Sequence, residues 1–143
     1  MTYEEFVEKL KGVCEQHNFT ENPNISSGEA NYKAFCFGGQ TFYDVPGDEK
    51  NPTRVSPMVL VYQDRYDNMK PKIDYDELVF YTSNAGSQLV KCKTKTHVLK
   101  VDKFDWVKFR KWLIDQNQAV QNSLVMYKQR GVNKLLKQIK KDF

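Results

Sequence analysis

The chain has 143 residues, of which 40% are hydrophobic and 13% aromatic. This composition excludes a disordered chain and favours one packed domain over residues 1–143. The net charge is +4, but residues 1–90 carry 8 Lys and Arg against 14 Asp and Glu, whereas residues 91–143 carry 14 against 4. An acidic front and a basic last third indicate a charged partner, such as nucleic acid, an acidic protein or a membrane surface.

The cysteines and the start of the chain bear on the compartment. Cys14, Cys36 and Cys92 are odd in number and widely spaced, which fits neither a disulfide framework nor a zinc site. Met1–Glu5 is acidic and lacks the apolar stretch of a signal peptide. No apolar run is long enough to span a bilayer. We therefore expect a cytoplasmic protein with free thiols and no membrane span.

The first predicted element is a helix that begins after Thr2. Thr2 and Glu5 have the spacing of a capping box, in which each side chain bonds the other residue's backbone N–H. Apolar residues then recur at helical spacing: Phe6, Val7, Leu10, Val13 and Cys14. We expect this helix to end near His17 and a polar loop to follow through Gly28.

The next predicted element is a β-hairpin. Ala30–Phe37 and Gln40–Val45 are rich in aromatic residues and flank Gly38-Gly39, a dipeptide typical of two-residue hairpin turns. Along the first strand, Lys33, Phe35 and Phe37 share one face. An open face of this kind would resemble a stacking platform for single-stranded nucleic acid, but we expect both phenylalanines in the core.

Several short strands are expected after this hairpin. Four runs have the residues typical of strands: Met58–Gln63, Leu78–Thr82, Gln88–Cys92 and Thr96–Val101. Three polar, proline-containing or glycine-containing segments are expected to connect them: a loop over Val45–Pro57, an acidic connection over Asp64–Glu77 and a turn over Ser83–Gly86.

The remainder of the chain is predicted to be helical, with Asp102 or Asp105 as its cap. A first apolar stripe consists of Trp106, Phe109, Leu113, Val120, Leu124 and Tyr127. Gly131 either breaks the helix or is tolerated within it. A second stripe consists of Val132, Leu135, Leu136, Ile139 and Phe143. We expect it to dock on the protein's own domain, although basic amphipathic helices also lie on membranes or enter a partner's groove.

Together these elements predict an α+β fold. An N-terminal helix is followed by an antiparallel sheet of about five or six strands, and one long or two C-terminal helices pack on one sheet face. The acidic portion, residues 1–90, would hold the first helix and most of the sheet. The basic portion, residues 91–143, would hold the last strands and the terminal helices.

The basic last third is the main candidate binding surface. Clustered cations suit phosphate binding because each contact releases counterions from the nucleic acid. The alternative is an ordinary solvated surface. The candidate residues are Lys91, Lys93, Lys95, Lys100, Lys103, Lys108, Arg110, Lys111, Lys128, Arg130, Lys134, Lys137, Lys140 and Lys141.

No enzymatic site is recognisable, and no cofactor or metal is expected. The acidic residues Asp64, Asp67, Asp74, Asp76 and Glu77 match neither a two-metal nuclease pattern nor an EF-hand, and a solvated loop explains them better. The two histidines, His17 and His97, belong to no nucleophile motif.

We therefore expect a non-enzymatic protein that engages nucleic acid or a nucleic-acid-handling protein through its basic third. Small, motif-less proteins of this composition are common among phage and mobile-element accessory proteins, which makes inhibition of a host nucleoprotein enzyme a more specific hypothesis. One alternative is a protein–protein adaptor or homodimer built on the C-terminal helices, with Val120, Leu124, Tyr127 and Leu135 as anchors. A metal-dependent enzyme using Asp74, Asp76 and Glu77 is a further alternative.

Overall fold

The computed structural model describes residues 1–39, 43–44, 53–54, 57–82 and 88–142. In chain order, the elements are α1 (Tyr3–Gln16), β1 (Phe19–Glu21), β2 (Ala30–Phe37), β3 (Tyr43–Asp44), β4 (Thr53–Arg54), β5 (Met58–Asp64), β6 (Lys70–Thr82), β7 (Gln88–Val98) and α2 (Trp106–Asp142). The predicted turn over Ser83–Gly86 lies outside the described residues.

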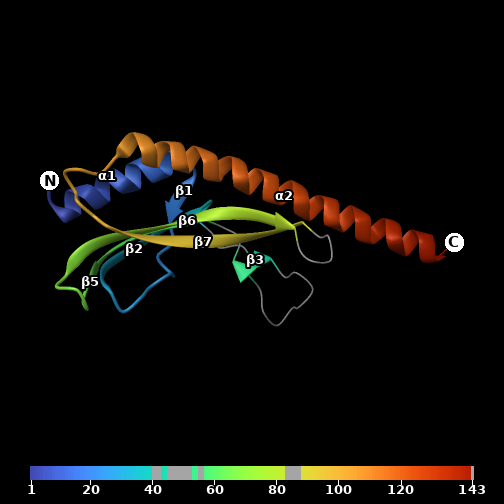
Figure 1. Ribbon diagram of the computed structural model, residues 1–143, viewed down its shortest axis with the longest axis horizontal. Coiled ribbons are helices and arrows are strands. Elements are labelled where there is room, and N and C mark those ends of the chain that lie inside the picture. The colour runs from blue at the N-terminus through green and yellow to red at the C-terminus, as the bar shows by residue number, and fades with distance from the viewer. Residues whose placement is uncertain (40–42, 45–52, 55–56, 83–87, 143) are drawn as a thin grey trace.

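Five strands form one antiparallel sheet in the order β1-β2-β5-β6-β7. Sequential strands are neighbours, so this sheet is a meander, and the short β3–β4 pair is inserted between β2 and β5. Figure 1 shows both helices on the same side of the sheet. The predicted α+β arrangement is therefore confirmed.

The start of α1 is capped as predicted. The Glu5 amide donates to Thr2 Oγ1 at 3.1 Å, and the Thr2 amide donates to Glu5 Oε1 at 3.3 Å. The helix ends at Gln16, with His17 as its C-cap, and Asn18 adopts a positive φ of 65°, which asparagine tolerates better than most residues. This residue turns the chain directly into β1, so the predicted polar loop is wrong at Phe19–Glu21.

The predicted Gly-Gly hairpin is also wrong. Gly38 and Gly39 do form a turn with φ of 61° and 72°, but β2 has β1 on one edge and β5 on the other. No edge of β2 is left for the following segment. Instead, Tyr43–Asp44 pairs with Thr53–Arg54, which lies inside the predicted loop, and the rest of Gln40–Val45 lies outside the described residues.

The second half of the sheet is more regular than predicted. β6 has 13 residues and begins at Lys70, so most of the predicted acidic connection is strand and only the turn after Asp64 connects β5 to β6. β7 is one continuous strand of 11 residues instead of two short ones. It ends at Val98, before the predicted end at Val101.

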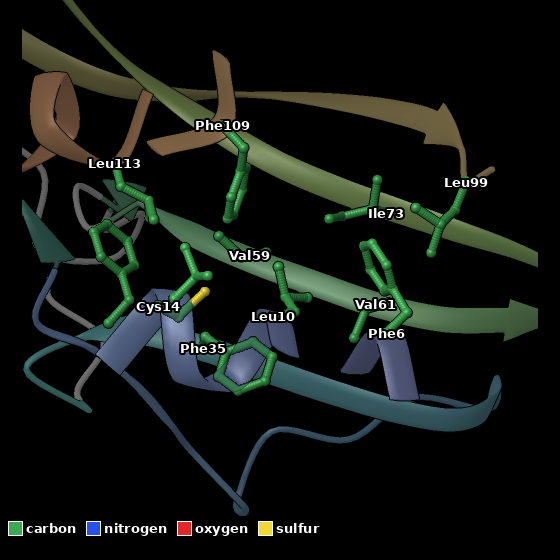
Figure 2. Close-up of a cluster of buried hydrophobic side chains, with 12 residues drawn as sticks. Phe6, Leu10, Cys14, Phe35, Val59, Val61, Ile73, Leu99, Phe109 and Leu113 are labelled. Carbon is green, nitrogen blue, oxygen red and sulfur yellow. The ribbon is translucent and has the colours of Figure 1, made fainter. Parts of the chain in front are cut away.

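The core lies between the sheet and the two helices (Figure 2). Phe6 and Leu10 from α1 and Leu113 from α2 are fully buried. They meet strand residues that are equally buried, including Phe35. Phe35 is thus a core residue, as expected, and does not offer an open stacking platform. Phe37 is partly buried against the same cluster.

α2 is a single helix of 37 residues that continues through Gly131. Asp105, not Asp102, caps it, because Asp105 Oδ1 accepts from the Lys108 amide at 3.0 Å. Its first apolar stripe is anchored as predicted by Phe109, Leu113 and Val120, which are buried. The side chains of Leu124 and Tyr127 lie outside the described ones.

The second apolar stripe does not dock on the domain, contrary to prediction. Four of its side chains are 45–59% exposed: Val132, Leu135, Leu136 and Ile139. At about 100° per residue, they centre about 110° around the helix axis from Val120, which faces the sheet. Figure 1 also shows this end of α2 projecting past the sheet. Phe143 lies outside the described residues.

Candidate functional site

Two adjoining hollows lie between β7, the segment that follows it and the start of α2. The first has a volume of about 270 Å³ and is lined by Ile73, Tyr75, His97, Val98, Lys100, Lys103, Phe104, Asp105, Lys108 and Phe109. The second has a volume of about 200 Å³ and is lined by Tyr75, Lys95, His97, Lys108 and Trp112. Three residues line both hollows, so they form one groove, which we call the β7–α2 groove.

Aromatic rings form the floor of this groove. The His97 ring stacks on Tyr75 with centroids 4.7 Å apart and an angle of 17° between the planes. Tyr75 meets Trp112 edge-on at 4.9 Å, and Trp112 stacks on Phe109 at 5.8 Å. Burial raises the pKa of Tyr75, so its hydroxyl keeps its proton at neutral pH. The floor is therefore a set of rings held in place by contacts with one another.

Lysines surround these rings. Lys100, Lys103 and Lys108 line the first hollow, Lys95 joins Lys108 at the second, and all four are exposed. Asp105 is the one acidic residue in either lining, and its carboxylate accepts the backbone N–H that caps α2. The groove thus combines a net positive charge with apolar ring surface.

One polar atom in the groove wall lacks a partner. Among the side chains that the structure describes, His97 Nε2 is the buried nitrogen or oxygen with no hydrogen bond. Leaving a buried polar atom unpaired costs about 1–3 kcal/mol. Nε2 is fully buried, so a molecule in the groove can reach it only if the His97 ring turns.

Six of the other predicted cations have described side chains, and none of these six lines the groove. Lys93 is exposed on β7 and Lys111 on α2, while the Arg110 guanidinium donates to Gln16 Oε1 at 2.7 Å and bridges the two helices. Three more are exposed on the projecting end of α2: Lys137, Lys140 and Lys141. Four have side chains outside the described ones: Lys91, Lys128, Arg130 and Lys134.

Acidic side chains that the structure describes in and beside the sheet pair with neighbouring Lys and Tyr side chains. Lys72 Nζ lies 2.6 Å from Asp64 and 3.1 Å from Asp67, and the hydrogen bond to Lys72 holds the pKa of each carboxyl below its usual value. Asp74 accepts the hydroxyl of Tyr62 at 3.1 Å. Among the described residues, no group of three or more His, Cys, Asp or Glu could hold a metal ion. The side chains of Asp76 and Glu77 lie outside that set.

Sequence reasoning identified the lysines of the groove but not its aromatic floor. Tyr75, His97 and Trp112 come from three elements, and nothing in their local sequence links them. One signal was available in the segment from Lys103 to Trp112, where cations and aromatic rings alternate closely. That interleaving is typical of surfaces that bind single-stranded nucleic acid.

The chain matches no known family model, and it resembles no curated protein and no solved structure at a significant level. In the part of the chain that the structure describes, no helix has the length and apolarity to cross a membrane.

Proposed function

We propose that the protein binds nucleic acid, or a nucleoprotein, through its basic third, with the β7–α2 groove as the primary contact. The observation that carries this proposal is the gathering of Lys95, Lys100, Lys103 and Lys108 around one ring-lined groove. These four exposed residues provide the cations that phosphates need, and neutralised phosphates release counterions. The protein has a binding role without catalysis in this proposal.

The test is fluorescence anisotropy with labelled oligonucleotides of about eight units, both single-stranded and duplex. At about 50 mM salt, we expect the unaltered protein to bind at least one of them. The combined change Lys100→Gln, Lys103→Gln and Lys108→Gln should weaken binding at least tenfold, because about three phosphate contacts are lost. The slope of log affinity against log salt should then become shallower by roughly 2 units for a single strand.

A matched control replaces Lys137, Lys140 and Lys141 by Gln. These lysines are equally exposed but lie on the projecting end of α2, so we expect binding of the short oligonucleotides to be unchanged within about twofold. Equal losses in both triple variants would contradict the groove as the primary contact. Absence of binding to every polynucleotide at low salt would contradict the function itself.

A more specific form of the proposal is inhibition of a host nucleoprotein enzyme in the cytoplasm. The groove would then compete for the RNA or DNA of that enzyme. Addition of the protein should slow the enzyme only when the groove lysines are intact.

A second candidate function is supported by the projecting end of α2. Four apolar side chains on one face of that segment are about half exposed, from Val132 to Ile139. Such a stripe suits an adaptor or a homodimer in which a second copy covers it. Val120 is not available as an anchor for that contact, because it is only 4% exposed within its own domain.

The dimer reading is tested by sedimentation equilibrium over a range of concentrations. We expect a mass that rises with concentration in the unaltered protein and stays monomeric in Leu135→Glu/Leu136→Glu. Gln138→Glu is the control, since it changes charge on the same segment outside the stripe. A strict monomer at about 100 µM would exclude the homodimer.

A further inference from the structure

We propose that the β7–α2 groove selects single-stranded nucleic acid, and that its two hollows receive consecutive nucleotides of one strand. This inference rests on the proposed function and names its ligand class. The bases stack against the ring floor of Tyr75, His97 and Trp112, while the lysines at the rim contact the phosphates between them.

The size of the hollows supports this ligand class. Their volumes, about 270 and 200 Å³, each fall below the roughly 300–1,000 Å³ of sites that enclose a drug-sized molecule. Each hollow therefore suits one planar ring or one phosphate-bearing unit. Because Tyr75, His97 and Lys108 line both hollows, two linked units can occupy them side by side.

The chemistry of the lining fits an unpaired strand. Base–aromatic stacking tolerates any sequence, since every base has a π face, and it accompanies a positive groove in proteins that bind single strands. His97 stacks on one face of Tyr75 and lines both hollows, so its other face is the flat surface that a base can contact. Its unpaired Nε2 is a polar group that the edge of a base or a phosphate can satisfy after a small rotation of the ring.

A duplex cannot use these features. Its bases are stacked inside the helix, so their faces are closed to protein rings, and proteins read only the base edges in the grooves. A duplex can still approach the lysines through its phosphates, but without the stacking contribution. We therefore expect base stacking to favour the single strand. The difference between its affinity and that of the duplex measures this effect.

The first test compares a single strand of about eight nucleotides with a hairpin duplex of the same sequence. We expect the single strand to bind at least tenfold more tightly, because each stacked base contributes roughly a 5- to 100-fold gain in affinity. Equal or tighter binding of the duplex would overturn this inference and leave the proposed function intact. Loss of all binding would instead overturn the proposed function.

The second test uses the quenching of tryptophan fluorescence to determine whether the strand contacts the floor of the groove. Trp112 lines the second hollow, whereas Trp106 lies against Phe6 and under the ammonium of Lys9. A dinucleotide should quench the emission of Trp106→Phe, in which Trp112 remains. It should not quench Trp112→Phe, even at concentrations at which anisotropy shows that this variant is saturated with the strand. Quenching in Trp112→Phe alone would contradict the assignment.

The third test separates stacking by His97 from a purely structural role. His97→Phe keeps a flat ring and His97→Leu removes it. We expect His97→Leu to weaken single-strand binding about 5- to 100-fold while His97→Phe stays within threefold. Both variants should bind the duplex equally. Thermal melting confirms that each is folded, and equal affinities of the two variants for the single strand would sink the stacking role.

Discussion

At the residue scale, Gln116 shows how one polar side chain completes the sheet. β5 begins at Met58 and its pairing with β6 starts at Tyr75, so the amide of Leu78 lies beyond the end of that ladder. Gln116 Oε1, which belongs to α2, accepts this N–H at 3.0 Å. Gln116 is only 5% exposed and sits beside the second cluster formed by Leu78 and Val120.

Removal of the Gln116 amide should therefore leave a buried donor unpaired. We expect Gln116→Leu to lower the free energy of unfolding by about 1–3 kcal/mol in urea denaturation. Gln118→Leu is the control, because Gln118 is exposed and donates to the exposed Asn122. It should change stability by no more than about 0.5 kcal/mol. Similar losses in both variants would show that the Leu78 amide does not depend on Gln116.

Lys72 allows a prediction about pH. The pKa values of Asp64 and Asp67 are lowered in the fold by their hydrogen bonds to Lys72. Because the pKa of each carboxyl is lower in the folded state, its ionised form stabilises the fold. This stabilisation is present above the pKa of the unfolded state, about 3.9, and is lost as the pH falls through the pKa of the folded state. We expect Lys72→Met to melt at a lower temperature than the unaltered protein at pH 7.

The difference between the two melting temperatures should shrink as the pH falls from about 5 to 2, where both carboxyls become protonated. Lys70→Met is the matched control, since the ion pair of Lys70 with Asp67 is longer, at 3.6 Å, and Lys70 is 55% exposed. Its effect at pH 7 should be smaller, as exposed ion pairs contribute little. If the difference in melting temperature between Lys72→Met and the unaltered protein stayed constant down to about pH 2, the stabilisation by Lys72 would not be ionic.

At the element scale, α2 is one helix with two different roles. Its first half is held by the core through Phe109 and Leu113, whereas Leu135 and Leu136 are more than half exposed. We expect Leu113→Ala to destabilise the protein by about 2–5 kcal/mol, because it leaves a cavity in the core. Leu135→Ala should stay within about 0.5 kcal/mol. Calorimetry at low protein concentration measures the stability of both variants. A large loss of stability in Leu135→Ala would contradict the prediction and show that the end of the helix is packed.

The elements that could be predicted from the sequence are those with a clear local pattern of residues. The capping box of α1, the apolar run of β5 and the first stripe of α2 are local patterns, and the structure confirms them. β1 was missed because it has three residues and depends on the positive φ of Asn18. The first half of β6 was missed because its outward residues are charged, although Ile73 and Tyr75 alternate with them.

The candidate site could be predicted only in part for a similar reason. Its lysines appear in the sequence as a basic run, whereas its floor depends on the register that brings Tyr75 of β6 opposite Lys95 and beside His97 of β7. That register follows from the long β6–β7 hairpin, which no local pattern revealed. Trp112 belongs to the floor because α2 packs on the sheet where Tyr75 lies.

At the scale of the whole molecule, α2 separates two basic regions. Lys108 borders the groove near the start of the helix, and Lys137 lies 29 positions later on the projecting end. At 1.5 Å per residue, they are roughly 44 Å apart along the helix. This is far beyond the Debye length of about 8 Å at physiological salt, so the two regions do not influence each other directly.

A sufficiently long strand can nevertheless contact both regions. A stacked single strand advances about 3.4 Å per nucleotide, so roughly 13 nucleotides span the distance between them. We expect affinity to rise slowly up to about 8 nucleotides and then to step up between about 12 and 20, because the second contact becomes intramolecular. Changing Lys137, Lys140 and Lys141 to Gln should remove this step and leave the binding of an 8-nucleotide strand unaltered. Anisotropy across an oligonucleotide length series measures the step, and a smooth rise that is identical in the triple variant would mean that the projecting lysines take no part in binding.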